Sequence, residues 1–163
     1  LKRLELSYSD FHNLKLYCDD NQILFLSTAD EEESATFLNN LQDIFKIGSG
    51  ELTNNPFLRH VAQFEKEVIL STGMANLAEV ERAIEVLCSS GLSVGKITVL
   101  HATTAYPTCA EDVNLNAMLT LRNAFPGIKV GYSDHTLGFS VPIAAVALGA
   151  STIEKHFTLN KNI

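Results

Sequence analysis

The sequence predicts an α/β protein of the (β/α)8 TIM-barrel class, with about six βα units in its 163 residues. Short β-branched or aromatic runs alternate with amphipathic stretches, which predicts parallel strands joined by right-handed helical crossovers. Polar side chains follow nearly every run. In a barrel the C-terminal strand ends converge on one mouth, where active sites lie. An open, doubly wound sheet is the competing architecture, and it would spread these side chains along a line.

Six segments have the composition and length of strands. They are Ile23–Thr28, Phe45–Gly50, Val68–Gly73, Ile97–Ala102, Val130–Asp134 and Thr152–Phe157. The intervals between them leave room for a loop, a helix and a return loop. Gly48-Ser49-Gly50 is followed by Glu51 and lacks the third glycine of a dinucleotide-binding turn, which argues against a nucleotide-binding open sheet.

Helices are predicted from start and stop signals between these strands. N-terminal caps are expected at Ser9–Asp10, Asp30, Asn76, Asn114 and Ser140, each ahead of apolar or small residues. Helix ends are expected at Gly91, Pro126-Gly127 and Gly149.

Composition and charge narrow the class of partner. Hydrophobic residues make up 46% and charged residues 19%, as in an ordinary globular domain with one core. The net charge of -7 disfavours nucleic acid and anionic membrane as partners, although a pocket can still be locally positive. No pair among the three cysteines has metal-ligand spacing, so we expect reduced thiols and a cytoplasmic protein. The longest nearly apolar stretch, Val141–Ala150, is too short to cross a bilayer.

Six strands do not close an eight-stranded barrel. We therefore expect two βα units to precede Leu1, with Leu1–Leu6 as the end of a helix from the preceding unit. Six residues follow Phe157, too few for a closing helix. On its own the 163-residue chain is expected to be inactive, and exposed edge strands should make it prone to aggregate.

Several motifs occur in a fixed order along the chain. They are Leu4-Glu5-Leu6-Ser7, Phe45-Lys46-Ile47-Gly48-Ser49-Gly50-Glu51, Ile69-Leu70-Ser71-Thr72-Gly73-Met74, Tyr106-Pro107, Glu111-Asp112-Val113-Asn114-Leu115, Tyr132-Ser133-Asp134-His135-Thr136 and Ile153-Glu154-Lys155-His156-Phe157. Together they resemble the N-acetylneuraminate (sialic acid) synthase family, which includes the legionaminic and pseudaminic acid synthases. The resemblance covers essentially the whole chain.

The resemblance implies a metal-dependent TIM barrel followed by a small antifreeze-like domain, in a protein that forms a homodimer. The chain, residues 1–163, matches strands three to eight, so the first two βα units and the C-terminal domain are absent from it. The implied reaction joins phosphoenolpyruvate to an N-acetylated amino sugar, such as N-acetylmannosamine or a 2,4-diacetamido sugar. Its products are a nonulosonic acid and phosphate.

The resemblance also assigns residues to the two substrates. The carried-over phosphoenolpyruvate-binding residues are Thr28, Lys46, Ser49, Ser71, Thr104 and Ser133. Hydroxyls and lysine suit this dianion, and a charge between Phe45 and Ile47 on a buried strand itself requires an anion. For the sugar, the carried-over contacts are Glu51, which can also transfer protons, and Tyr106. Strand-end hydroxyls also cap helices, and Glu51 also suits a helix N-terminus.

His135 and His156 resemble the family's two metal ligands, and with Lys46 and Glu51 they complete the expected catalytic set. They follow adjacent predicted strands, so their imidazoles can converge on one ion that acts as a Lewis acid on the sugar aldehyde. Mn²⁺ is the family's metal, and nitrogen ligation also permits Co²⁺ or Zn²⁺. Asp134 is either a partner that orients an imidazole or a cap.

Two other functions remain open from the residues. One is a barrel aldolase or lyase that forms a Schiff base through Lys46 or Lys155, for which the histidine pair has no use. The other is a catalytically inactive barrel remnant with a structural or spore-coat role, against which the nearly complete polar mouth argues.

Overall fold

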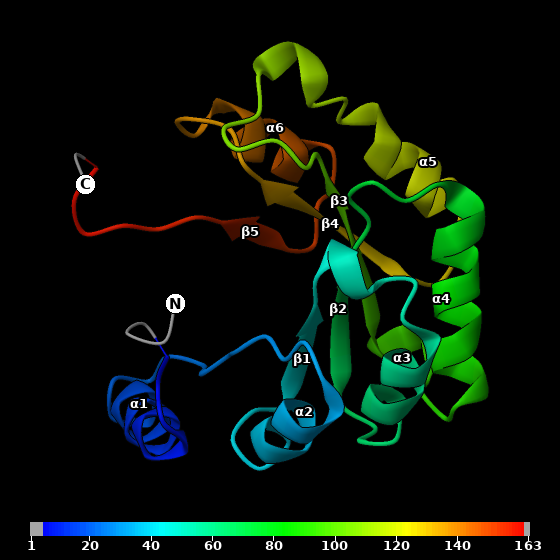
Figure 1. The fold of residues 1–163 in the computed structure, drawn as a ribbon. Helices are drawn as coiled ribbons and strands as arrows, with labels where there is room; N and C mark the ends of the chain where they lie inside the picture. Colours follow the sequence, from blue (N-terminus) through cyan, green and yellow to red (C-terminus); the bar gives the residue numbers. More distant parts are fainter. Residues whose placement is uncertain (1–4, 162–163) are drawn as a thin grey trace.

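The computed structural model of the chain describes residues 5–161. Five parallel strands form its single sheet, in the order β1-β2-β3-β4-β5 (Figure 1). They are β1 (Ile44–Ile47), β2 (Glu67–Ser71), β3 (Ile97–Ala102), β4 (Lys129–Asp134) and β5 (Ile153–Lys155). Most of the expected helix end at Leu1–Leu6 lies outside the described residues, and Glu5 and Leu6 are not helical.

The strand order decides between the two architectures. Each strand pairs in parallel with the next one along the chain, and the order never reverses. A doubly wound sheet changes direction at a switch point, whereas a barrel is built by adding strands one after another. The sheet is therefore a half-barrel arc, and the open-sheet alternative does not describe it.

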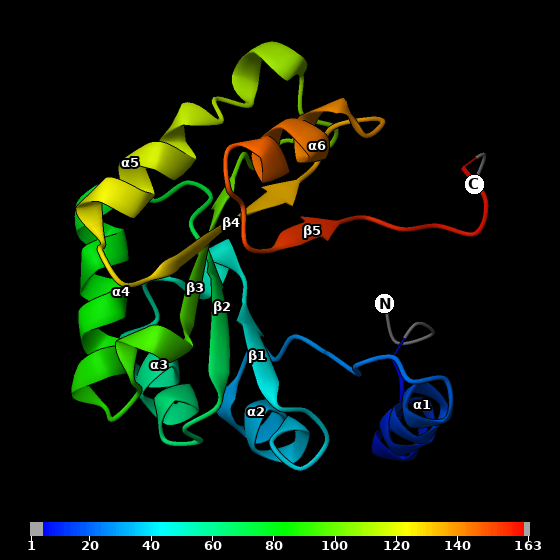
Figure 2. The same cartoon turned by 180° about the vertical axis from the view of Figure 1, so that it is seen from behind.

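Helices alternate with the strands through most of the chain. They are α1 (Tyr8–Asp20), α2 (Glu32–Leu38), α3 (Asn55–Ala62), α4 (Leu77–Ser89), α5 (Asn116–Ala124) and α6 (Ser140–Ala147), with short 3-10 turns η2 (Ser49–Glu51), η3 (Val94–Lys96) and η4 (Ala110–Asp112). In both ribbon views α3, α4 and α5 lie along the same side of the sheet (Figures 1 and 2). α3 packs on α4, while α5 packs on β3 and β4.

Two predicted helix starts are shifted, because side chains nearer the first turn supply the bonds. α1 begins after Ser7, not at Ser9–Asp10: the Ser7 hydroxyl accepts from the Asp10 amide at 3.2 Å, and the Asp10 carboxylate accepts from the Ser7 amide at 2.8 Å. Glu31, not Asp30, caps α2, and its carboxylate accepts from the amides of Glu33 and Ser34.

Of the other three predicted N-terminal caps, one is found as predicted and two are not. Asn76 caps α4 as predicted, in a capping box with Glu79. Asn114 does not cap α5: it has a φ of +44°, and α5 begins at Asn116 without a side-chain cap. Ser140 is the first residue of α6.

The predicted strand at Ile23–Thr28 is wrong. This segment is extended but pairs with no strand of the sheet. The Gln42 side chain makes the hydrogen bonds that a neighbouring strand would otherwise make with Ser27. Its Oε1 accepts from the Ser27 amide at 2.8 Å, and its Nε2 donates to the Ser27 carbonyl at 3.0 Å. The described chain thus holds five strands of the six expected.

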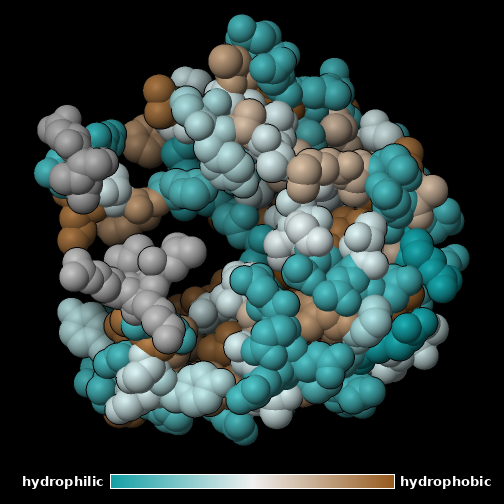
Figure 3. Space-filling view, in the orientation of Figure 1, coloured by the Kyte–Doolittle hydropathy of each residue, from teal (hydrophilic) through white to brown (hydrophobic). Residues whose placement is uncertain are grey.

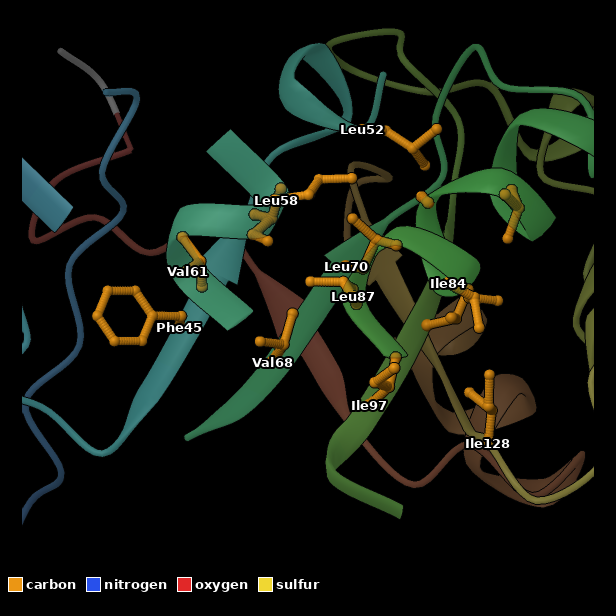
Figure 4. Packing of buried hydrophobic residues seen from close by; sticks show 14 of the residues in the cluster. Phe45, Leu52, Leu58, Val61, Val68, Leu70, Ile84, Leu87, Ile97 and Ile128 are labelled. Carbon is orange, nitrogen blue, oxygen red and sulfur yellow. The ribbon is translucent and has the colours of Figure 1, made fainter. Parts of the chain in front are cut away.

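Alternation along the strands separates an apolar face from a polar one. Val68, Leu70 and Ile97 lie beside residues of α3 and α4 (Figure 4). The Phe45 ring lies 5.1 Å from that of Phe64, which follows α3. The buried core lies there, between sheet and helices. The residues between them in sequence face the inside of the arc, where the polar side chains gather.

Candidate active site

A cavity of about 250 Å³ opens on the inner face, at the C-terminal ends of the strands. It is lined by Lys46, Gly48, Ser49, Gly50, Ser71, Ala102, Thr104, Tyr106, Ser133, His135 and Glu154. The strand register accounts for this grouping, because Ala102 lies beside Ser133 and Ser133 beside Glu154 in the parallel ladder. Residues at matching register positions point to the same face of a sheet.

Lys46 is the cation of this cavity. It is 9% exposed, and its Nζ lies 3.4 Å from the Glu154 carboxylate and 3.4 Å from the Ile47 carbonyl. Both separations are long for bonds to an ammonium group, which has three donors. Lys46 therefore keeps donor capacity for an anion that enters the cavity.

Hydroxyl groups line the same cavity as this cation. The Ser71 Oγ is buried and, among the described residues, has no hydrogen-bond partner. A buried polar atom without a partner is costly, so this hydroxyl suits a ligand. Thr104 and Ser49 approach each other over Gly73, where a Cβ would lie 2.4 Å from the Thr104 hydroxyl and 3.3 Å from that of Ser49. Only glycine leaves room for both hydroxyls at the mouth.

The two predicted metal ligands lie together. The ring centroids of His135 and His156 are 5.4 Å apart, and the Tyr106 ring lies 4.2 Å from that of His135. The His135 Nδ1 lies 2.9 Å from the Thr103 carbonyl oxygen. Because a carbonyl can only accept, this Nδ1 carries the proton, and Nε2 is left for another partner.

This pair fits a metal ion with open coordination positions. Zinc–nitrogen bonds, for example, are about 2.0–2.1 Å long, and two rings at this spacing could reach one such ion. A carbonyl that fixes the imidazole through its other nitrogen is the usual support of a metal-binding histidine. No group of three or more metal-ligating side chains occurs in residues 5–161.

Three predicted site residues do not line the cavity. Thr28 is exposed at the end of the unpaired segment. Glu51 lies in η2, where its Oε2 accepts from the Asn54 amide group at 2.6 Å. His156 follows the end of β5 and is exposed, although its ring contacts those of His135 and Tyr106.

Glu154 lines the cavity and had no predicted role. Its Oε1 accepts from the Ser133 hydroxyl at 2.6 Å, and its Oε2 is the atom nearest the Lys46 ammonium. Its place in the cavity follows from its register beside Ser133, a pairing between distant segments that the sequence alone does not show.

Asp134 contacts no imidazole, contrary to one of the two roles considered for it. Burial opposes its ionisation, but hydrogen bonds from Lys155 and Thr136 hold the pKa of the Asp134 carboxyl below its usual value. Burial and the nearby Asp134 charge raise the pKa of Tyr132 to about 12. Lys155 bonds to Asp134 and does not line the cavity, so it is badly placed for a Schiff base there.

No helix in the described part of the chain is long and apolar enough to span a membrane. The architecture and the site together define the class: an α/β half-barrel domain with a polar, cation-containing cavity and a histidine pair at its C-terminal strand ends.

Comparisons with known proteins identify the family. The NeuB family model matches residues 1–163, and the chain belongs to this family. It is 51% identical to the N,N'-diacetyllegionaminic acid synthase of Campylobacter jejuni, over 100% of this chain and 49% of that protein. It is 37% identical to the N-acetylneuraminate-9-phosphate synthase of Drosophila melanogaster, over 98% of this chain and 42% of that protein.

A solved structure agrees with this assignment. The spore coat polysaccharide biosynthesis protein of Bacillus subtilis superposes with a TM-score of 0.93 at 37% identity, over 98% of this chain and 44% of that one. The chain spans about half the length of the curated relatives it matches.

Proposed function

We propose that the complete protein condenses phosphoenolpyruvate with an N-acetylated amino sugar and water, and releases a nonulosonic acid and phosphate. The observation that carries the proposal is the nearly buried Lys46, which lies with four serine and threonine residues in one cavity beside the histidine pair. A compact dianion and an aldehyde held side by side are what this reaction needs.

The cavity supplies the groups that bind the dianion. Lys46 neutralises charge, while Ser49, Ser71 and Thr104 donate hydrogen bonds to phosphate or carboxylate oxygens. In the ligand-free chain the Ser133 hydroxyl donates to Glu154. When the anion enters, Lys46 and Ser133 turn from the Glu154 carboxylate toward it.

The reaction then needs a fixed geometry between the two substrates. C3 of phosphoenolpyruvate bonds to the aldehyde carbon, and the aldehyde oxygen takes up a proton. Water adds at C2, and the C2–O bond to phosphate breaks to leave the keto acid. Tyr106, whose ring lies beside both imidazoles, is suited to pack on the sugar. Thr28 and Glu51 are substrate contacts in this proposal only if their segments move inward.

His135 and His156 would hold the divalent metal, for which Mn²⁺ is proposed and Co²⁺ or Zn²⁺ are the alternatives. Bound there, the metal supplies Lewis-acid polarisation of the sugar carbonyl. The other ligands are expected from substrate, water or parts of the protein outside the chain. A homodimer in the cytoplasm, built from a complete barrel and a C-terminal domain, is the proposed state of the whole protein.

The sugar is proposed from the relatives. The 51% identity to a diacetyllegionaminic acid synthase makes its 2,4-diacetamido precursor the first sugar to test, ahead of N-acetylmannosamine. Phosphate release from phosphoenolpyruvate is followed with the complete protein, Mn²⁺ and each sugar in turn. We expect release to require one sugar and to be lost in His135→Ala. Absence of release with every sugar, from a folded and metal-loaded protein, would favour an inactive remnant.

A further inference from the structure

The β4–β5 ladder ends immediately before the two histidines. Its last register pair is Asp134 with Lys155. His135 is the first residue after β4, and His156 is the first residue after β5. Beyond that pair no ladder holds the strands together. The spacing of the two imidazoles therefore depends on whatever fixes the strand ends.

A buried ion pair joins these ends on the opposite face. Lys155 Nζ donates to Asp134 Oδ2 and, at 2.8 Å, to the Thr136 carbonyl. The Asp134 side chain is 0% exposed and that of Lys155 is 24% exposed. The other Asp134 oxygen, Oδ1, accepts from the Thr136 amide at 3.0 Å and from its hydroxyl at 2.8 Å.

These contacts fix the residues immediately before and after His135. Asp134 precedes it, Thr136 follows it, and both are bound to the lysine that precedes His156. The His135 carbonyl also accepts from the Thr108 amide at 2.9 Å. In the described residues, no comparable set of hydrogen bonds acts on the His156 ring, which has ring contacts only.

We propose that the Asp134–Lys155 pair is a positioning clamp, which holds His135 and His156 at the spacing needed for both to bind one ligand. The proposal rests on the proposed metal site for the identity of that ligand. Neither clamp residue touches the cavity, so both act through the backbone of the histidines. Partners that orient metal ligands are typically worth about 10- to 100-fold in metal affinity.

The test compares two lysines in the complete protein. Lys155→Met removes the clamp cation and keeps an apolar stem. Lys66→Met is the matched control, because Lys66 is also 24% exposed and also donates to backbone carbonyls, those of Asn39 and Gln42. Lys66 precedes β2, at the opposite end of the sheet from the histidines.

Mn²⁺ affinity is measured by titration with detection of the free ion by electron paramagnetic resonance. We expect about a 10- to 100-fold weaker affinity in Lys155→Met and no change in Lys66→Met. Wild-type Mn²⁺ affinity in Lys155→Met, whatever its loss of thermal stability, would make the pair merely structural and overturn the clamp.

A second readout needs no metal. The imidazole resonances of His135 and His156 are followed by NMR in the metal-free protein. The clamp predicts shifted or exchange-broadened signals for both rings in Lys155→Met, and unchanged signals in Lys66→Met. If the complete protein binds no Mn²⁺, the metal site fails and this NMR comparison alone decides the clamp.

Lys155→Arg keeps the test decisive if Lys155→Met does not fold. It preserves the charge but replaces a compact ammonium with a larger planar group, which changes the geometry of both contacts. A folded Lys155→Arg protein with weakened Mn²⁺ binding and altered histidine signals supports the clamp. The same protein with wild-type affinity and wild-type histidine signals refutes it.

Discussion

The Lys46 side chain combines a nearly buried charge with an incomplete set of partners. Within residues 5–161 its one carboxylate neighbour is Glu154, which lies 3.4 Å away and whose side chain is 40% exposed. Burying a charge is costly unless it is paired and hydrogen-bonded. An incoming dianion would complete the charge pairing that Glu154 begins. Lys46 should therefore contribute more to ligand binding than to folding.

Lys46→Met should therefore weaken phosphoenolpyruvate binding. A hydrogen bond to a charged group is worth roughly 1.5–3 kcal/mol, so we expect KM for phosphoenolpyruvate to rise by about 10- to 100-fold. Steady-state phosphate release by the complete protein measures it. Lys15→Met is the control, because Lys15 pairs with Asp19 on the exposed surface of α1.

Glu154→Gln tests the same ion pair by removing its negative member. The amide oxygen can still accept from Ser133, but the negative charge that competes for Lys46 is gone. KM for phosphoenolpyruvate should then stay level or fall. A rise as large as that of Lys46→Met would show that Glu154 helps bind the anion instead of competing with it.

At the scale of elements, the junction of β4 and β5 controls the site. Gly131 lies on the inner face of β4, where a Cβ would meet the Thr152 carbonyl oxygen at 2.5 Å and the Leu100 side chain at 2.6 Å. That carbonyl accepts from the Tyr132 amide at 2.9 Å and so belongs to the strand pairing. Added volume at Gly131 must push the two strands apart.

Gly131→Ala should destabilise the protein by about 1–3 kcal/mol and weaken Mn²⁺ binding, because overpacking displaces β5 and with it His156. Denaturant unfolding and Mn²⁺ titration measure the two effects. Gly95→Ala serves as the control, since a Cβ there meets nothing within 4 Å. Wild-type stability in Gly131→Ala would contradict this description of the junction.

The same elements show how far the sequence leads. The strand periodicity predicted the parallel sheet, and the family resemblance of the motifs indicated seven of the cavity residues. Ile23–Thr28 has the composition of a strand, yet the Gln42 side chain, and not a second strand, bonds its backbone. A contact made by a single side chain leaves no periodic pattern in the sequence. Glu154 was missed because its importance comes from register with Ser133, which depends on long-range pairing.

For the whole molecule, the half-barrel leaves apolar surface uncovered. Phe139, Ile143 and Val146 are 68%, 68% and 55% exposed, and with Pro142 and Ile153 they line a groove over α6 and β5. Figure 3 shows apolar residues at the surface on the side toward the chain termini, beside an open hollow. Exposed apolar surface of this kind favours association.

Ile143→Glu should have opposite consequences in two lengths of the protein. In the 163-residue chain it should reduce self-association, because it places a charge in the exposed groove. In the complete protein, where we expect the rest of the barrel to cover the groove, it should cost at least about 2 kcal/mol of stability. Analytical ultracentrifugation and denaturant unfolding measure these effects. Val94→Glu, at an exposed apolar site on η3, is the control.

The sequential strand order also determines the order in which the site residues appear during synthesis on the ribosome. Lys46 emerges with the first strand of the sheet, while Glu154 and His156 emerge with the last. Domains fold as the chain is made, from the N-terminus onward. Until β5 docks, a nascent chain has only His135 of the proposed metal-binding pair and lacks the Glu154 partner of Lys46, so we expect metal binding to require the complete sheet.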